Sequence, residues 1–225
     1  MATPANGALV AAIPVRNALE WTQPLVESML DGDAVDQVWL FDNGSTDDTA
    51  DWAATLAIAD TRLKVSTRPR ERLHGMWNEM VSRASGMPGT HLAILNNDIR
   101  LHPETLRRMR DEMGDFDLAF IDREIGAEAP TDVRAIPASW TERTGWMFMI
   151  RADFWRGQPF AIDPGLRWWW GDDDLARRAQ GRGGRLCTLE GLGCSHAISQ
   201  SEYVGDRLSD IEHDRAYFSR LWPEP

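Results

Sequence analysis

Short apolar runs alternate with stretches of helical periodicity along the first half of the chain. The apolar runs predict buried strands at 8–15, 36–41, 62–66, 91–95 and 116–121. Between these runs, apolar residues recur at helical spacing, which predicts helices over 18–30, from the polar turn at 42–49 to about Ala59, over 73–85 and over 103–113. This alternation indicates an α/β fold with a mostly parallel sheet and helices on both faces.

The pattern changes after Ile121. Residues 122–143 carry Gly, Pro and charge, which predicts a loop with one strand at 133–136. Further strands are predicted at 145–150, 184–189 and 192–197, and a helix over about 172–180 that Gly181 ends. The tail predicts an amphipathic helix that packs on the domain, or alternatively forms a dimer contact, through Tyr203, Leu208, Ile211, Tyr217 and Leu221. We interpret residues 1–225 as a single domain with parts at about 8–121, 122–200 and 201–221.

The charge balance excludes some classes of partner. Acidic residues outnumber basic residues by 35 to 24, which gives a formal net charge of −11. Because like charges repel, this balance disfavours bare nucleic acid and anionic lipid, and it suits a protein that recruits a divalent cation. We expect no membrane span and no signal peptide, because the chain has no long apolar run and its start has no basic segment. Cys187 and Cys194 predict reduced thiols in a cytoplasmic protein, with a hairpin disulfide as the alternative.

Three acidic clusters are each expected to follow a predicted strand. They contain Asp42, Asp47 and Asp48; Asp98; and Asp172, Asp173 and Asp174. Taken alone, the first could be a turn with Ser45 or Thr46 capping the next helix, the second an Asx turn, and the third an acidic first helical turn. Together they converge at the carboxyl ends of the strands, where ligands bind in open parallel sheets. The clusters therefore predict a metal-assisted site for a phosphorylated ligand.

The order of these segments resembles glycosyltransferase family 2, the inverting enzymes of the GT-A fold. The resemblance covers roughly residues 8–197 and is carried by AIPVRN (12–17), VWLFDNGSTDDT (38–49), HGMWNEMVSRASG (74–86), HLAILNNDI (91–99), TGWMFMIRADFW (144–155) and FAIDPGLRWWWGDDDLARRAQGRGG (160–184). It implies a Rossmann-like sheet with a smaller mixed acceptor-side region. It also implies a nucleoside-diphosphate sugar donor of the UDP or GDP type, Mn²⁺ or Mg²⁺, and an acceptor hydroxyl.

The resemblance assigns roles to individual residues. The first half would bind the nucleotide-sugar through Pro14, Arg16, Asn17, Asp42, Ser45, Asn78 and Asn97, with Ser45 otherwise only a cap. Asp98 would bind the metal, Asn96 stands where the first Asp of the family's DxD motif usually sits, and His196 matches a late metal-binding His or is a core His.

The second half would hold the acceptor and the general base. Asp172 matches the Asp of the family's acidic pair and would be the base, with Gly171 replacing the usual Glu, and Asp173 is the fallback. Trp168, Trp169, Trp170 and Asp163 would bind the acceptor. Consecutive residues on an extended segment alternate faces, so at least one of the three Trp is expected in the core. Arg70, Arg72 and His74 could reach the phosphates, although a solvated position is favoured.

Other functions fit fewer of these features. The main alternative is a catalytically degenerate GT-A-like protein that binds a sugar nucleotide or a glycan, with Asn96 as its chief support. A phosphohydrolase would need a second Asp where Gly44 stands, and a nucleotidyltransferase would typically show a Gly-rich loop where residues 14–17 read PVRN. The sequence names neither the sugar, nor the acceptor, nor the oligomeric state.

Overall fold

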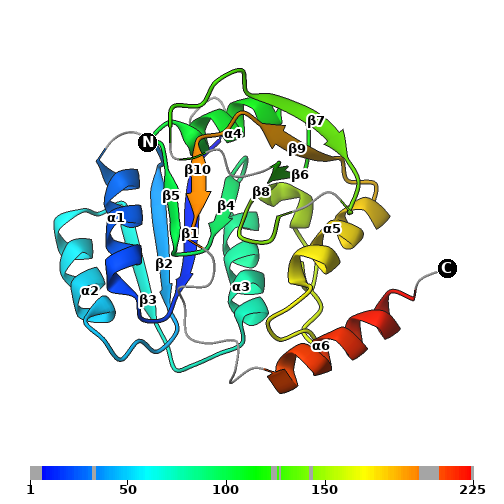
Figure 1. Ribbon diagram of the computed structural model, residues 1–225, viewed down its shortest axis with the longest axis horizontal. Coiled ribbons are helices and arrows are strands. Elements are labelled where there is room, and N and C mark those ends of the chain that lie inside the picture. Colours follow the sequence, from blue (N-terminus) through cyan, green and yellow to red (C-terminus); the bar gives the residue numbers. More distant parts are fainter. Residues whose placement is uncertain are drawn as a thin grey trace.

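An eight-stranded sheet forms the centre of the computed structural model, which describes residues 7–31, 34–122, 126, 128–141, 144–197 and 208–223. The strand order is β3-β2-β1-β4-β8-β6-β9-β7 (Figure 1). Strands β7 and β8 run antiparallel to their neighbours, and the other strands share one direction. The bounds are β1 Leu9–Val15, β2 Gln37–Asp42, β3 Leu63–Thr67, β4 His91–Leu95, β6 Leu118–Ile121, β7 Arg134–Ala138, β8 Met147–Arg151 and β9 Leu186–Glu190. The mostly parallel α/β sheet is therefore confirmed.

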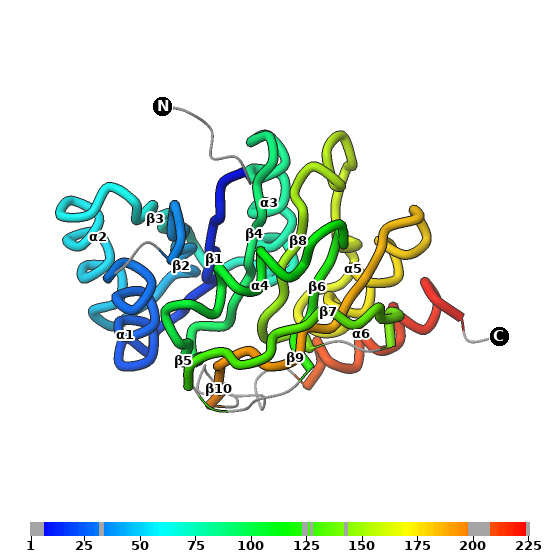
Figure 2. The backbone as a smooth tube through the Cα atoms, turned by 90° about the horizontal axis from the view of Figure 1, so that it is seen from above, coloured from blue at the N-terminus to red at the C-terminus, as the bar shows by residue number. Residues whose placement is uncertain are grey.

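Helices cover both faces of this sheet, also as predicted. Alternate residues of β1 point to opposite faces, so Ala11 and Ile13 join one buried cluster while Val10 and Ala12 join the other. The first cluster is covered by α1 (Leu19–Leu30), α2 (Thr49–Ala59) and α4 (Thr105–Met113), and the second by α3 (Leu73–Ser85), α5 (Gly171–Gly181) and the 3₁₀ helix η1 (Ala152–Trp155). Figure 2 shows α2 and the last helix, α6 (Leu208–Leu221), at opposite ends of the sheet.

A small second sheet was not predicted, and it matters for the site. Strand β5 (Ile99–Leu101) pairs antiparallel with β10 (Cys194–His196), and His196 lies opposite Ile99 in the register. The Ala197 N–H continues this pairing by donating to the Asp98 carbonyl, at 3.0 Å. Strand β10 lies within the strand predicted at 192–197, whereas the three-residue β5 carries too little periodicity to be read from sequence. Their pairing brings two distant polar residues, Asp98 and His196, together.

The turn before α2 differs from the expected cap. The helix begins at Thr49 after Asp48, and neither Ser45 nor Thr46 caps it. The Asp47 carboxylate instead accepts the Thr49 N–H at 3.1 Å, and the Ser45 hydroxyl oxygen accepts the Asn17 N–H at 2.8 Å. Since Ser45 ties two loops together, the prediction of a Ser45 or Thr46 cap is wrong.

One further expectation is corrected in the second half. The third acidic cluster does not follow a strand, because an irregular segment separates η1 from α5. The tail helix is described over Leu208–Leu221, and Tyr203 lies outside the described residues. Leu208 is 60% exposed, whereas the residue of α6 that is fully buried is the acidic Asp214. Tyr217 and Phe218 pack against the second core cluster, as the predicted packing helix requires, and the buried Asp214 adds a polar attachment beside them.

The cysteines agree with the sequence prediction. Cys187 and Cys194 are both free and buried. Burial raises the pKa of the Cys187 thiol to about 12, so this thiol stays protonated at neutral pH. Among the helices that the structure describes, none has both the length and the apolar character that crossing a membrane requires.

Candidate functional site

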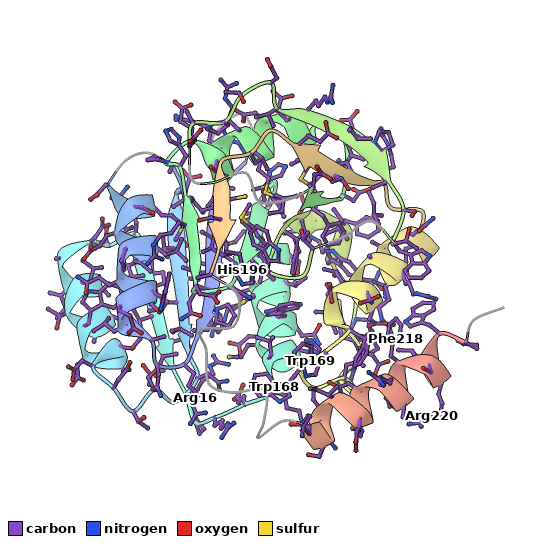
Figure 3. All side chains as sticks on the ribbon, viewed as in Figure 1. Arg16, Trp168, Trp169, His196, Phe218 and Arg220 are labelled. Atoms are coloured by element: carbon purple, nitrogen blue, oxygen red, sulfur yellow. The ribbon has the colours of Figure 1, made fainter. Side chains whose placement is uncertain are left out.

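A cavity of about 380 Å³ opens at the carboxyl ends of β1, β2 and β4. This is the edge of the sheet at which the sequence predicts the ligand. Figure 3 shows Arg16, Trp168, Trp169 and His196 gathered there from three separate segments. Most of the predicted site residues line this cavity: Pro14, Arg16, Asn96, Asn97, Asp98, Trp168, Trp169, Trp170, Asp172 and His196.

Asp98 and His196 form the candidate metal centre. Their facing atoms, Asp98 Oδ1 and His196 Nε2, lie 3.1 Å apart. The Asn96 side-chain nitrogen is 3.4 Å from the same imidazole nitrogen, and a 180° turn of that amide presents its oxygen instead. The Trp146 indole stacks on the imidazole with ring centroids 5.0 Å apart and fixes its plane.

The donor set at this centre is small. In the part of the chain that the structure describes, no group of three or more His, Cys, Asp and Glu side chains could hold a metal ion. One carboxylate, one imidazole and one amide fit a divalent cation that takes its remaining ligands from water or from phosphate oxygens. The residues present therefore suit a cation that arrives with a phosphorylated ligand.

Three residues expected to bind the donor, Asn17, Asp42 and Ser45, lie behind the cavity and do not line it. Asp42 is fully buried, and its Oδ1 accepts the Ser45 N–H at 3.1 Å. Asn17, in the left-handed region with φ 61°, accepts the Thr46 N–H on its side-chain oxygen at 2.7 Å. Asn17, Asp42 and Ser45 thus hold the loops after β1 and β2 against each other, and Asn43 lines the cavity. The second oxygen of Asp42, Oδ2, has no hydrogen-bond partner within the described residues.

Asn78 and Asp163 support the site from outside the cavity. The Asn78 side chain accepts the N–H groups of Ala161 and Ile162, at 2.8 and 2.9 Å, and donates to the Ile162 carbonyl. The Asp163 carboxylate accepts the Tyr217 hydroxyl and the Gly165 N–H, both at 2.9 Å. Neither residue lines the cavity, and both support the 161–165 backbone, while donor binding by Asn78 and acceptor binding by Asp163 stay predictions.

The structure separates the two candidate bases. Asp172, on the first turn of α5, lines the cavity, whereas its neighbour Asp173 is buried and does not. A Cβ at Gly145 would lie 2.7 Å from Asp172 Oδ2, so the glycine leaves room for this carboxylate. The geometry therefore favours Asp172 over Asp173 as the group that faces a ligand.

His74 is a cavity-lining residue that the sequence placed in solvent. It is 1% exposed, while Arg70 and Arg72 are exposed as predicted. Burial lowers the pKa of the His74 imidazole to about 4, which keeps the ring neutral at pH 7. His74 lies three and seven residues before Trp77 and Val81, and this helical spacing indicates that all three share the buried face of α3. A Cβ at position 171 would lie 2.2 Å from His74 Nε2, so Gly171 makes room for the imidazole.

The tryptophan run lies at the mouth of the cavity. None of the three is fully buried, so the expectation that one packs into the core is wrong; Trp169 is 36% exposed. Trp170 has a left-handed backbone, φ 59°, and stacks on Phe218 of α6 with ring centroids 6.3 Å apart. All three indoles line the cavity, and Trp169 is the most exposed of them.

Comparison with known proteins agrees with this geometry. Residues 11–165 match the model of the family described as glycosyl transferase family 2. No curated protein sequence matches the chain.

Solved structures share the fold at low sequence identity. One is the mannosyltransferase PcManGT from Pyrobaculum calidifontis, in complex with GDP-Man and Mn²⁺, with TM-score 0.71 and 12% identity over 97% of this chain and 65% of that one. Another is TarS 1–349 of S. aureus with UDP, with TM-score 0.64 and 16% identity over 83% of this chain and 59% of that one. A third is glucosyl-3-phosphoglycerate synthase from Mycobacterium tuberculosis with Mn²⁺, UDP and glucosyl-3-phosphoglycerate. Its TM-score is 0.63, with 13% identity over 97% of this chain and 81% of that one. This chain thus spans less than two thirds of the length of the PcManGT and TarS chains.

Proposed function

This chain belongs to glycosyl transferase family 2, and from that premise we propose that it moves a sugar from a nucleoside-diphosphate sugar to an acceptor hydroxyl with inversion at the anomeric carbon. One observation carries the proposal: a single cavity gathers Arg16, Asp98, Asp172 and His196 from distant segments of the chain. The fold relatives whose structures hold GDP-Man with Mn²⁺, or UDP, support the choice of donor class. We assign residues 8–121 to the donor and 122–200 to the acceptor.

Residues at the end of β1 and β2 would hold the nucleotide. Pro14 and Arg16 line the cavity there, and the Arg16 guanidinium suits a diphosphate because it is a permanent cation. The unpartnered Oδ2 of Asp42 is an acceptor that an N–H of a nucleobase would satisfy. A small rearrangement of the Asn43 loop would have to expose it, because Asp42 is fully buried.

Asp98, His196 and Asn96 would hold the divalent cation. Their carboxylate, imidazole and amide are the described donors next to the 380 Å³ cavity. When bound, a divalent cation neutralises the negative charge that develops on a diphosphate leaving group. The stacked Trp146 keeps the His196 ring in the plane that presents Nε2 toward Asp98.

Asp172 would act as the general base. Its carboxylate accepts the proton of the acceptor hydroxyl while the hydroxyl oxygen forms its bond to the anomeric carbon. The bond from that carbon to the diphosphate oxygen breaks on the opposite side, and its electron pair leaves with the nucleoside diphosphate. In-line displacement of this kind inverts the anomeric configuration. Trp168 and Trp169 would offer flat faces on which an acceptor sugar stacks.

A thermal-shift screen tests this function. We expect UDP or GDP at about 100 times its dissociation constant to raise the melting temperature by roughly 5–10 °C with Mn²⁺, because a ligand of the native state stabilises it by about 2.7 kcal/mol. Without Mn²⁺ the rise should be much smaller. A cooperative melt that no nucleoside diphosphate shifts at millimolar concentration would overturn the donor site.

A further inference from the structure

The segment between η1 and α5 carries the cavity's aromatic residues without regular structure. Residues 163–170 form neither helix nor strand, yet they present Trp168 and Trp169 to the cavity and lead directly into Asp172. Backbone N–H groups outside helices and strands need other partners to stay in one conformation. Asp163 finds its partner on α5 and Gly165 bonds within the segment, while the N–H groups next to the cavity, at 167–169, find their partner on α6.

A single buried carboxylate of α6 accepts three successive backbone N–H groups of this segment. Asp214 Oδ2 lies 2.8 Å from the Trp168 nitrogen and 3.0 Å from the Trp169 nitrogen, and both carboxylate oxygens lie 3.1 Å from the Arg167 nitrogen. Burial raises the pKa of Asp214, but these N–H groups and His213 outweigh it and hold the pKa below its usual value. The carboxylate therefore stays ionised at neutral pH.

Neighbouring residues of α6 complete the attachment. The Asp210 carboxylate lies 2.7 Å from Arg167 Nη1, and Phe218 stacks on Trp170. Figure 3 places Phe218 on the side of α6 that faces α5, and Arg220 on the other side. Trp170 adopts a left-handed backbone that bulky residues rarely adopt, and such a conformation persists only where surrounding contacts fix it. These contacts set the entry to α5 and thus the position of Asp172.

We propose that Asp214 is a positioning residue for the transfer reaction, which holds the tryptophan run and the start of α5 in the arrangement that faces the acceptor. The proposal rests on the proposed function, because it takes Asp172 as the base. A carboxylate that served only to attach α6 would stabilise the chain without affecting the acceptor side of the cavity. The two roles differ in what happens to turnover when nucleotide binding is preserved.

Hydrogen exchange tests the attachment without any reference to activity. In the native chain, the amides of Arg167, Trp168 and Trp169 should exchange as slowly as those in the middle of α5, although their segment is irregular. Asp214→Asn should speed their exchange at least about tenfold, because an amide group cannot accept all three N–H groups. The matched control is Glu212→Gln, which removes the same charge from an exposed position of α6. Fast exchange in the native chain, or no change in Asp214→Asn, would overturn the proposal.

Turnover then tests positioning. Asp214→Asn should lower the release of nucleoside diphosphate from a sugar nucleotide about tenfold or more, while the affinity for UDP or GDP with Mn²⁺ stays within about twofold. Unchanged turnover, or an equal loss of nucleotide affinity, would contradict positioning. If Asp214→Asn does not fold, Asp210→Asn takes its place, with faster exchange at Arg167 and a smaller loss of turnover expected. If the native chain turns over no sugar nucleotide, the proposed function fails while the exchange data still decide the attachment.

Discussion

Asp172→Asn is expected to lower sugar transfer by roughly 10²–10⁴-fold, the range that a positioned general base contributes. The carboxamide nearly matches the carboxylate in size but cannot take the acceptor proton. Because the proposed function assigns Asp172, which lines the cavity, to the acceptor and not to the nucleotide, affinity for UDP or GDP with Mn²⁺ should stay within about twofold. The measurement pairs initial rates on a sugar nucleotide with calorimetric titration of the nucleotide.

The neighbouring Asp173→Asn supplies the control. Asp173 is buried and does not line the cavity, so Asp173→Asn should lower the melting temperature. At a temperature where the variant is folded, it should keep most of the native rate. Transfer that survives in Asp172→Asn but is lost in folded Asp173→Asn would reverse the assignment. Transfer that survives in both variants would remove the carboxylate base from the mechanism.

Asp98→Asn is expected to abolish most of the contribution that Mn²⁺ makes to nucleotide binding. The change removes the one carboxylate of the candidate metal centre and leaves an amide and an imidazole, which hold a hard cation poorly. Affinity for UDP or GDP in the presence of Mn²⁺ should fall at least about tenfold, or ~1.4 kcal/mol. Without Mn²⁺, the variant and the native chain should bind the nucleotide alike.

Asp115→Asn is the control for this variant. Its carboxylate is 91% exposed, lies 4.0 Å from Arg185 Nη1 and does not line the cavity. The same loss of charge should therefore leave nucleotide binding unchanged. A variant Asp98→Asn that keeps the full effect of Mn²⁺ would place the cation elsewhere. His196→Gln offers a second route to the same question, since His196 Nε2 faces Asp98 Oδ1.

Most of the fold follows from local patterns in the sequence. Strands β1, β2 and β4 begin and end within a residue of their apolar runs, because strands buried on both faces read as continuous apolar stretches. The helix over 73–85 matches α3, since its apolar positions keep a strict helical period. The edge of the sheet at which the cavity opens follows in turn from the parallel arrangement.

The rest of the site depends on long-range contacts that no local pattern encodes. Asn78 carries a motif position, yet its amide binds the backbone of residues 161–162, which lie more than eighty positions away. His196 reaches Asp98 only through the short β5–β10 pairing. The buried Asp214 binds the backbone of residues 167–169, more than forty positions away, which the apolar pattern of its helix does not reveal. Polar side chains that support a loop cannot be told from polar side chains that bind a ligand until their partners are known.

The most direct test follows the anomeric carbon. The chain is mixed with a UDP- or GDP-sugar and Mn²⁺, with water or a sugar as acceptor, and early products are recorded by proton NMR before free sugar can mutarotate. The account predicts a released nucleoside diphosphate and a first product whose anomeric configuration is opposite to that of the donor. A nucleotide that binds while every donor stays intact would make the chain a binding protein, and a product with the donor's configuration would contradict in-line attack assisted by Asp172.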